Sequence, residues 1–135
     1  MSREVALDLP ADADGARRAA EAARELLAGA ADEAAFACEL AVAEACANVV
    51  EHAGGGAPAL RVVLRRRDGR FSAAVCDRAP DAFLPPPGAA LPPPEAESGR
   101  GLALMEACMD RVARVRRDGE NRLLMVRRLV PGDGR

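Results

Sequence analysis

The sequence predicts an α+β fold, a two-layer sandwich in which helices pack on one face of a mostly antiparallel, mixed sheet. Two hairpin signals indicate the sheet, because Asp68-Gly69 and Asp118-Gly119 each join two runs of strand-forming residues. Two long helical patterns precede the first hairpin, and a third separates the two hairpins. This grouping of strands and helices is typical of an α+β sandwich.

The first half of the chain predicts one strand and two helices. Residues 3–9 alternate loosely between apolar and polar side chains and predict the opening strand. Pro10 and the acidic residues after it start a helix that runs to Leu27. A second helix is expected from Asp32 to about Ala53, where a run of glycines terminates it. The residues expected on its core face are Phe36, Leu40, Ala43, Ala47 and Val50.

The second half of the chain predicts two hairpins and one further helix, which runs from Gly101 to Val112. The expected strands are residues 60–67, 70–76, 112–117 and 122–130. Residues 83–98 hold six of the ten prolines, which excludes a regular helix or a central strand there. This segment is expected to be either a lid over a site or a flexible loop, within a single domain that spans residues 1–135.

Composition restricts the classes of function. Half of the residues are hydrophobic, but Trp and Tyr are absent, so the core must consist mainly of Leu, Val and Ala. Direct nucleic-acid binding by aromatic stacking is disfavoured for the same reason. Every basic residue is Arg, and the lack of Lys excludes phosphate-loop nucleotide binding and Schiff-base chemistry. Charge is uneven, with a net charge of −7 over residues 1–60 (11 acidic, 4 basic) and +5 over residues 61–135 (10 acidic, 15 basic).

The four cysteines are expected to be buried free thiols, because none forms a C-x-x-C pair. Cys38 and Cys46 would lie about 12 Å apart along one helix, which is too far for a disulfide. The N-terminus lacks a signal-peptide pattern, and no apolar run approaches the length of a membrane span. We therefore expect a cytoplasmic protein that makes no membrane contact.

Polar residues interrupt the second helix at a regular spacing. Glu44, Asn48 and His52 are four residues apart, so they share one helix face. Polar groups in an apolar setting cost free energy unless something satisfies them. A carboxylate, an amide and an imidazole aligned in this way can hold a metal-bound phosphate and activate a hydroxyl. The alternatives are a partly exposed glutamate, a capping or core amide, and a structural histidine.

Two further segments carry chemical signals. Asp77 ends an apolar strand, where a buried carboxylate needs a hydrogen-bond donor; the alternative is a turn-forming aspartate. Ser98-Gly99-Arg100-Gly101-Leu102 leads into the third helix, and such a glycine-rich entry can bring backbone N–H groups to a phosphate. The side chain of Arg100 is expected either to pair with the terminal phosphate or to lie in solvent.

Together these segments resemble the anti-sigma-factor serine/threonine kinase family, within the histidine-kinase-like ATPase superfamily and its Bergerat-type ATP-binding domains. Residues 44–48, followed by His52-Ala53, are similar to the N box of the family. Residues 75–80 are similar to its first Gly box in altered form, and residues 99–105 to its second Gly box. The resemblance covers roughly residues 3 to 130.

The resemblance implies a transcription regulator that binds ATP and Mg²⁺. It would transfer the γ-phosphoryl group to a serine of a STAS-type anti-sigma-factor antagonist, and its partners would include a sigma factor and a second copy in a homodimer. Glu44 would be the catalytic base, Asn48 would bind Mg²⁺ and Asp77 would bind the adenine amino group. The other residues implied in nucleotide binding are Ala79, Gly99, Arg100, Gly101 and Leu102.

The first Gly box departs from the family pattern. The family shows Asp-x-Gly-x-Gly, whereas this chain has Ala79 and Asp81 at the glycine positions. Glycine permits a positive φ angle and a close approach of the backbone to a ligand, and this chain lacks both glycines. In addition, Asp81 places a negative charge near the expected phosphates. An alternative function is therefore a catalytically inactive module that sequesters a sigma factor or an antagonist. The catalytic half of a histidine kinase is disfavoured, because His52 is the only histidine.

Overall fold

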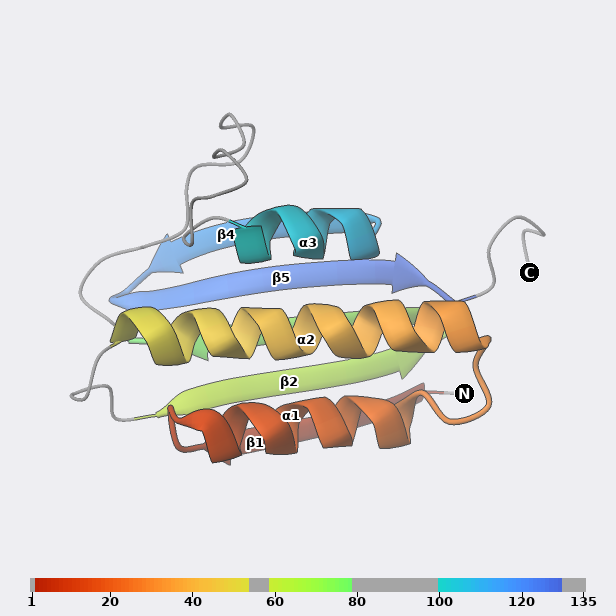
Figure 1. Ribbon diagram of the computed structural model, residues 1–135, viewed down its shortest axis with the longest axis horizontal. Coiled ribbons are helices and arrows are strands. Elements are labelled where there is room, and N and C mark those ends of the chain that lie inside the picture. Colours follow the sequence, from red (N-terminus) through yellow and green to blue (C-terminus); the bar gives the residue numbers. More distant parts are fainter. Residues whose placement is uncertain (1, 54–58, 79–99, 130–135) are drawn as a thin grey trace.

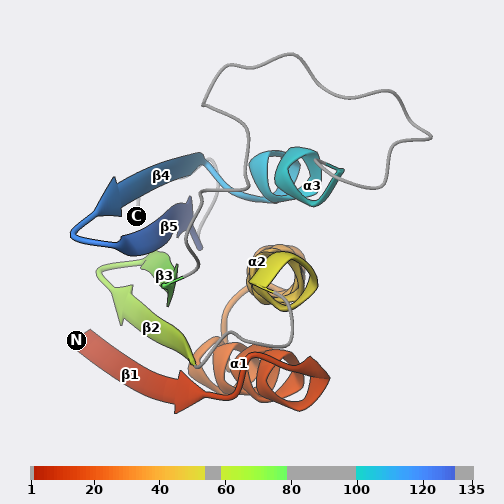
Figure 2. The same ribbon diagram turned by 90° about the vertical axis from the view of Figure 1, so that its left-hand side faces the viewer.

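The computed structural model describes residues 2–53, 59–78 and 100–129, and the structural statements below concern these residues. They form one five-stranded antiparallel sheet with three helices on one face (Figures 1 and 2). The elements are β1 (Ser2–Leu9), α1 (Ala13–Leu26), α2 (Asp32–Ala53), β2 (Leu60–Arg67), β3 (Arg70–Asp77), α3 (Arg100–Cys108), β4 (Arg111–Arg117) and β5 (Glu120–Arg128). The predicted α+β sandwich is confirmed, and every strand pair is antiparallel.

The strand order is β1-β2-β3-β5-β4, so β3 lies in the centre of the sheet. Both predicted hairpin turns are present, because Arg67 pairs with Arg70 and Arg117 pairs with Glu120. The turn residues Asp68 and Asp118 have φ angles of 50° and 53°. The glycines after them have φ angles of 74° and 76°, as a two-residue turn with left-handed central residues requires. These two turns set the register of four of the five strands.

Helix α1 starts close to the end of β1 through a tight connection. The Asp12 carboxylate accepts a hydrogen bond of 2.8 Å from the backbone N–H of Gly15 and caps the helix. A Cβ atom at Gly15 would lie 1.9 Å from the carbonyl oxygen of Pro10, so only glycine fits at this position. The tight connection between β1 and α1 therefore depends on the absence of a side chain at Gly15.

Helix α2 lies between α1 and α3 and packs on the sheet (Figure 2). The predicted core face of this helix is wrong at Phe36, which is 66% exposed, and at Ala47, which is also exposed. The other three predicted core residues, Leu40, Ala43 and Val50, are only partly buried. The buried residues of the helix are instead Ala34, Ala37, Cys38, Ala41, Val42, Ala45, Cys46, Asn48 and Val49. The helix is apolar on nearly all sides, so its sequence pattern did not identify the buried face. Two flanking helices and the sheet then bury the side that carries the smaller residues.

The expected boundaries of the remaining elements agree with the structure within a few residues, and the third helix ends at Cys108, before the predicted Val112. The proline-rich segment at residues 83–98 lies outside the described residues. No helix in the described ranges has the length and apolar character needed to span a membrane.

Two phenylalanines test this account of the core. Phe71 on β3 is fully buried, whereas Phe36 on α2 is mostly exposed. We expect Phe71→Ala to lower the free energy of unfolding by about 3–5 kcal/mol, because it removes a large buried side chain. We expect Phe36→Ala to change it by less than about 0.5 kcal/mol.

Urea unfolding followed by circular dichroism measures both variants. If Phe71→Ala does not fold, Phe71→Leu replaces it, with a smaller expected loss because leucine leaves a smaller cavity. Equal destabilisation by the two alanine substitutions would contradict the assignment of the buried face.

Candidate functional site

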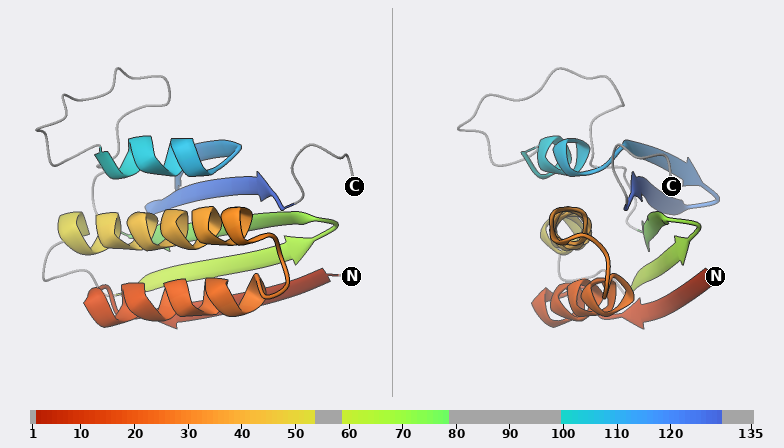
Figure 3. Two further views of the ribbon diagram at one scale, coloured as in Figure 1. Left: turned by 45° about the vertical axis from the view of Figure 1, so that its right-hand side comes forward. Right: turned by 90° about the vertical axis from the view of Figure 1, so that its right-hand side faces the viewer.

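One end of the molecule brings four elements together: the C-terminal half of α2, the start of α3, the end of β3 and the start of β5 (Figures 1 and 3). Six of the residues predicted for a site come from these elements, namely Glu44, Asn48, Asp77, Arg100, Gly101 and Leu102. Segments that are far apart in the sequence therefore contribute to one region of the structure. The burial and the hydrogen bonds of each residue indicate which chemical groups this region can bind.

The carboxylate of Glu44 lies at the first turn of α3. A Cβ atom added to Gly101 would be 3.3 Å from the Glu44 Oε2 atom. This distance is shorter than most contacts that Cβ atoms make in proteins. Helices α2 and α3 pack against each other, and Glu44 is half-buried at this contact. The structure thus places the glutamate of the first motif beside the glycine of the last motif. Glycine at this position leaves room for the carboxylate and for a ligand at the helix start.

Asn48 is buried one turn further along α2, with 8% of its surface exposed. Its Nδ2 atom is fully enclosed and has no hydrogen-bond acceptor among the described residues. An unsatisfied buried amide costs about 1–3 kcal/mol, so a native protein usually provides it with a partner. The amide oxygen can bind a cation, and the amide nitrogen can donate a hydrogen bond.

Asp77 is 5% exposed at the end of β3, and its carboxylate is held by a neighbouring strand. Asn121 on β5 donates a hydrogen bond of 3.0 Å from Nδ2 to Asp77 Oδ1. Arg116 on β4 in turn donates a hydrogen bond of 2.6 Å from Nη1 to Asn121 Oδ1. The three residues form one row across three strands, because Asp77 pairs with Asn121 and Asn121 pairs with Arg116. A buried carboxylate fixed in this way is suited to accept a hydrogen bond from a ligand amino group.

Asn121 and Arg116 were not predicted as site residues from the sequence. Both lie near the Asp118-Gly119 turn, whose position was predicted. Combining that turn with the alternation of the strand would have placed Asn121 on the same side of the sheet as the buried Leu123 and Met125. A polar residue at such a position is a signal for a buried hydrogen-bond network.

The structure leaves several predicted residues untested. Ala79 and Gly99 lie outside the described residues, and for His52 and Arg100 only the helical backbone is described. Leu102 is partly buried and packs against the hydrophobic core. Its predicted contact with a nucleotide therefore stays a prediction.

The first turn of α3 has the chemistry of an anion site. The first backbone N–H groups of a helix have no partner within the helix, and the helix dipole favours negative charge there. Arg100 and Gly101 form this first turn, and Glu44 lies beside it. A phosphate bound to these N–H groups would lie near both the Glu44 carboxylate and the side of α2 that carries Asn48.

The described residues provide no group of three or more His, Cys, Asp or Glu side chains that could hold a metal ion. Mg²⁺ is usually held by one or two protein oxygens together with substrate phosphates and waters, and the side-chain amide oxygen of Asn48 is a ligand of that kind. Burial raises the pKa of the Cys38 and Cys46 thiols to about 12. Because the thiolate is the reactive form, these two free cysteines are inert at neutral pH, as expected of buried thiols.

Comparisons with known proteins agree with the fold of this chain. The solved structure of the RsbU and RsbW domains of Rv1364c from Mycobacterium tuberculosis matches with a TM-score of 0.69 and 23% sequence identity. The match covers 94% of this chain but only 32% of the other, so it concerns the fold of one part of that protein. A search of curated proteins finds no significant sequence match. The family model that describes the histidine kinase-like ATPase domain matches residues 9–127, and the chain therefore belongs to that family.

Proposed function

We propose that this chain is an ATP-dependent regulator that transfers the γ-phosphoryl group of Mg-ATP to a serine of a STAS-type anti-sigma-factor antagonist. The contact between Glu44 and the first turn of α3 supports this function most directly. It puts a candidate base beside a candidate phosphate site, with the unsatisfied amide of Asn48 one helical turn away. We further propose cytoplasmic action and a sigma factor as the second partner.

Each residue would have a distinct role in the transfer. The N–H groups at the start of α3 would hold the phosphates, and Asn48 would give its amide oxygen to Mg²⁺. Glu44 would accept the proton of the serine hydroxyl as the new oxygen–phosphorus bond forms. The bond between the γ-phosphorus and the β–γ bridging oxygen would break, which leaves ADP. Catalysis by this site would consist mainly of positioning and charge neutralisation.

Adenine recognition would be the role of Asp77. Its carboxylate would accept a hydrogen bond from the exocyclic amino group, and the Asn121 amide would keep it in the required orientation. Guanine carries a carbonyl oxygen at the equivalent position, which a carboxylate would repel. The site would therefore prefer ATP to GTP.

A second candidate function is a binding module that sequesters a sigma factor or an antagonist without catalysis. The observation that favours it is the altered first Gly box, in which Ala79 and Asp81 stand where the family has glycines. Incubation with labelled Mg-ATP and a candidate antagonist protein separates the two functions. Label on an antagonist serine supports the kinase, and complex formation without transfer supports the module.

We expect Asn48→Ala to abolish Mg²⁺-dependent nucleotide binding while the fold stays intact. The variant removes a buried amide that has no acceptor in the described structure, so its loss should not destabilise the folded state. Isothermal titration with Mg-ATP and thermal unfolding measure the two effects. Affinity equal to that of the wild type would remove Asn48 from the metal site.

We expect Glu44→Gln to retain ATP binding and to lose phosphoryl transfer by roughly 10²–10⁴-fold, because a general base acts only in the chemical step. The matched control is Glu33→Gln, which changes an exposed glutamate in the first turn of the same helix. Single-turnover transfer to the antagonist is the measurement. An undiminished rate in Glu44→Gln would show that this carboxylate is structural.

We expect Asn121→Ala to weaken ATP binding about tenfold or more and to reduce the preference for ATP over GTP, since a buried carboxylate loses a hydrogen bond of about 1–3 kcal/mol. Arg122→Gln is the control, because Arg122 is the next residue on β5 and points to the opposite face. Parallel titrations with ATP and GTP give the comparison. An unchanged ATP-to-GTP ratio would contradict the role of the Asp77–Asn121 pair.

A further inference from the structure

The outer face of the sheet, opposite the helices, concentrates positive charge. No described element covers this face (Figure 3). The arginines that alternation along the strands assigns to it are Arg61, Arg65, Arg67, Arg70, Arg111, Arg117, Arg122 and Arg128. The strand carboxylates on the same face are Glu4, Asp8 and Glu120. The proposed kinase function uses none of these residues.

Three of these arginines stand side by side across the sheet. Arg67 pairs with Arg70, and Arg70 pairs with Arg128, so the arginine row runs over β2, β3 and β5. Like charges directly opposite each other on neighbouring strands are destabilising. A bound anion would relieve this repulsion.

The carboxylates near the arginine row neutralise it only weakly. Arg67 Nε is 3.6 Å from Asp68 Oδ2, and both side chains are mostly exposed, so this ion pair contributes little. Asp110 accepts a hydrogen bond of 2.7 Å from the backbone N–H of Arg128 and not from its guanidinium. Among the described residues, no carboxylate forms an ion pair with the side chain of Arg70 or Arg128.

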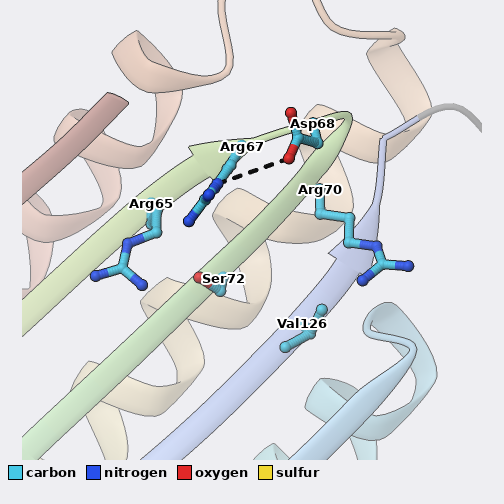
Figure 4. Close-up of a pocket in the computed structure, with 6 residues that line it drawn as sticks. All are labelled: Arg65, Arg67, Asp68, Arg70, Ser72 and Val126. Atoms are coloured by element: carbon cyan, nitrogen blue, oxygen red, sulfur yellow. Dashed lines mark ion pairs between the residues drawn. The ribbon is translucent and has the colours of Figure 1, made fainter. Parts of the chain in front are cut away.

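A hollow of about 530 Å³ lies against the arginine row (Figure 4). The residues that line it are Arg65, Arg67, Asp68, Arg70, Ser72 and Val126. Ser72 and Val126 pair on the neighbouring strands β3 and β5 and line the hollow beside the arginines (Figure 4). Arg65 already binds Glu4, with Nη2 2.8 Å from Oε2. The hollow lies at the β2–β3 turn, at the opposite end of the sheet from Asp77 and Asn121.

An apolar row crosses the same face next to the charged region. Its members are Ala6, Val63, Ala74, Leu124 and Ala113, which pair in this order across all five strands. Leu124 is 38% exposed, and the nearby Val115 is 41% exposed. Leu124 and Arg128 are four residues apart on one strand, so the apolar row and the arginine row are separated by roughly 13 Å. Arginine beside exposed apolar side chains is a typical composition of a protein–protein interface.

We propose that this outer face docks an acidic segment of a partner protein. Carboxylates of the segment would bind the arginine row and enter the hollow, and its apolar side chains would cover the apolar row. A nucleic acid fits less well, because no described aromatic side chain lies on this face and a phosphate backbone leaves the apolar row uncovered. A second copy of the chain fits less well, because it would bring two arginine-rich faces together.

Titration of the ¹⁵N-labelled full chain with a synthetic peptide tests the proposal. The peptide carries glutamates at both ends of a leucine- and valine-containing centre, and its control has glutamine in place of every glutamate. We expect the glutamate peptide to shift the backbone resonances of β3 and β5 on this face, and 0.5 M salt to weaken binding strongly. The double variant Arg67→Gln with Arg70→Gln should lose about tenfold or more in affinity.

The control double variant is Arg17→Gln with Arg18→Gln, which removes the same charge from exposed positions on α1. It should bind the peptide within about threefold of the wild type, since its charges lie on α1, in the layer on the other side of the sheet. Equal binding of the glutamine peptide, or no shifts at millimolar glutamate peptide, would overturn the proposal. Tighter binding of a single-stranded oligonucleotide with the same number of negative charges, or concentration-dependent shifts of these strands without peptide, would also overturn it.

Discussion

The packing of α2 between α1, α3 and the sheet is the constraint on which the rest of the structure depends. The contact side of α2 consists of alanine, cysteine and valine residues, so the neighbouring helices and the sheet approach it closely. This packing determines which face of α2 is buried. Asn48 is buried together with the apolar residues, and Glu44 is directed to the start of α3. A helix packed in another rotation would expose the amide to water and separate the carboxylate from Gly101.

The sequence alone predicted features that depend on neighbouring residues. It did not predict features that depend on how the strands pair. Asp68-Gly69 and Asp118-Gly119 predicted both hairpins because few residue pairs accept two consecutive positive φ angles. The Glu44–Asn48 spacing predicted a polar face on α2 for a similarly local reason. In contrast, the Asp77–Asn121–Arg116 network joins residues from three strands, and it exists only because of how those strands pair. The buried face of α2 was also not predictable, because apolar residues occur on nearly all sides of this helix.

The two layers of the molecule divide its charge and its proposed interactions. The helical layer carries much of the acidic half of the sequence and one side of the candidate nucleotide site. The outer sheet face carries the arginine row, which lies outside the candidate nucleotide site. The proposed function and the proposed docking of an acidic segment would need surfaces that can be occupied at the same time. Opposite faces of one sheet satisfy that requirement without any change of fold.

Nuclear magnetic resonance of the side-chain amides tests the central claim most directly, which is that α2, α3 and the end of the sheet form a site for Mg-ATP. The chain contains no glutamine and only two asparagines, Asn48 and Asn121, so its side-chain carboxamide signals all come from the candidate site. The account predicts that Mg-ATP shifts both pairs of amide signals, and that removal of Mg²⁺ by a chelator reverses the shift of Asn48 more than that of Asn121. If millimolar Mg-ATP leaves both pairs unchanged while the protein is folded, the proposed nucleotide site is wrong.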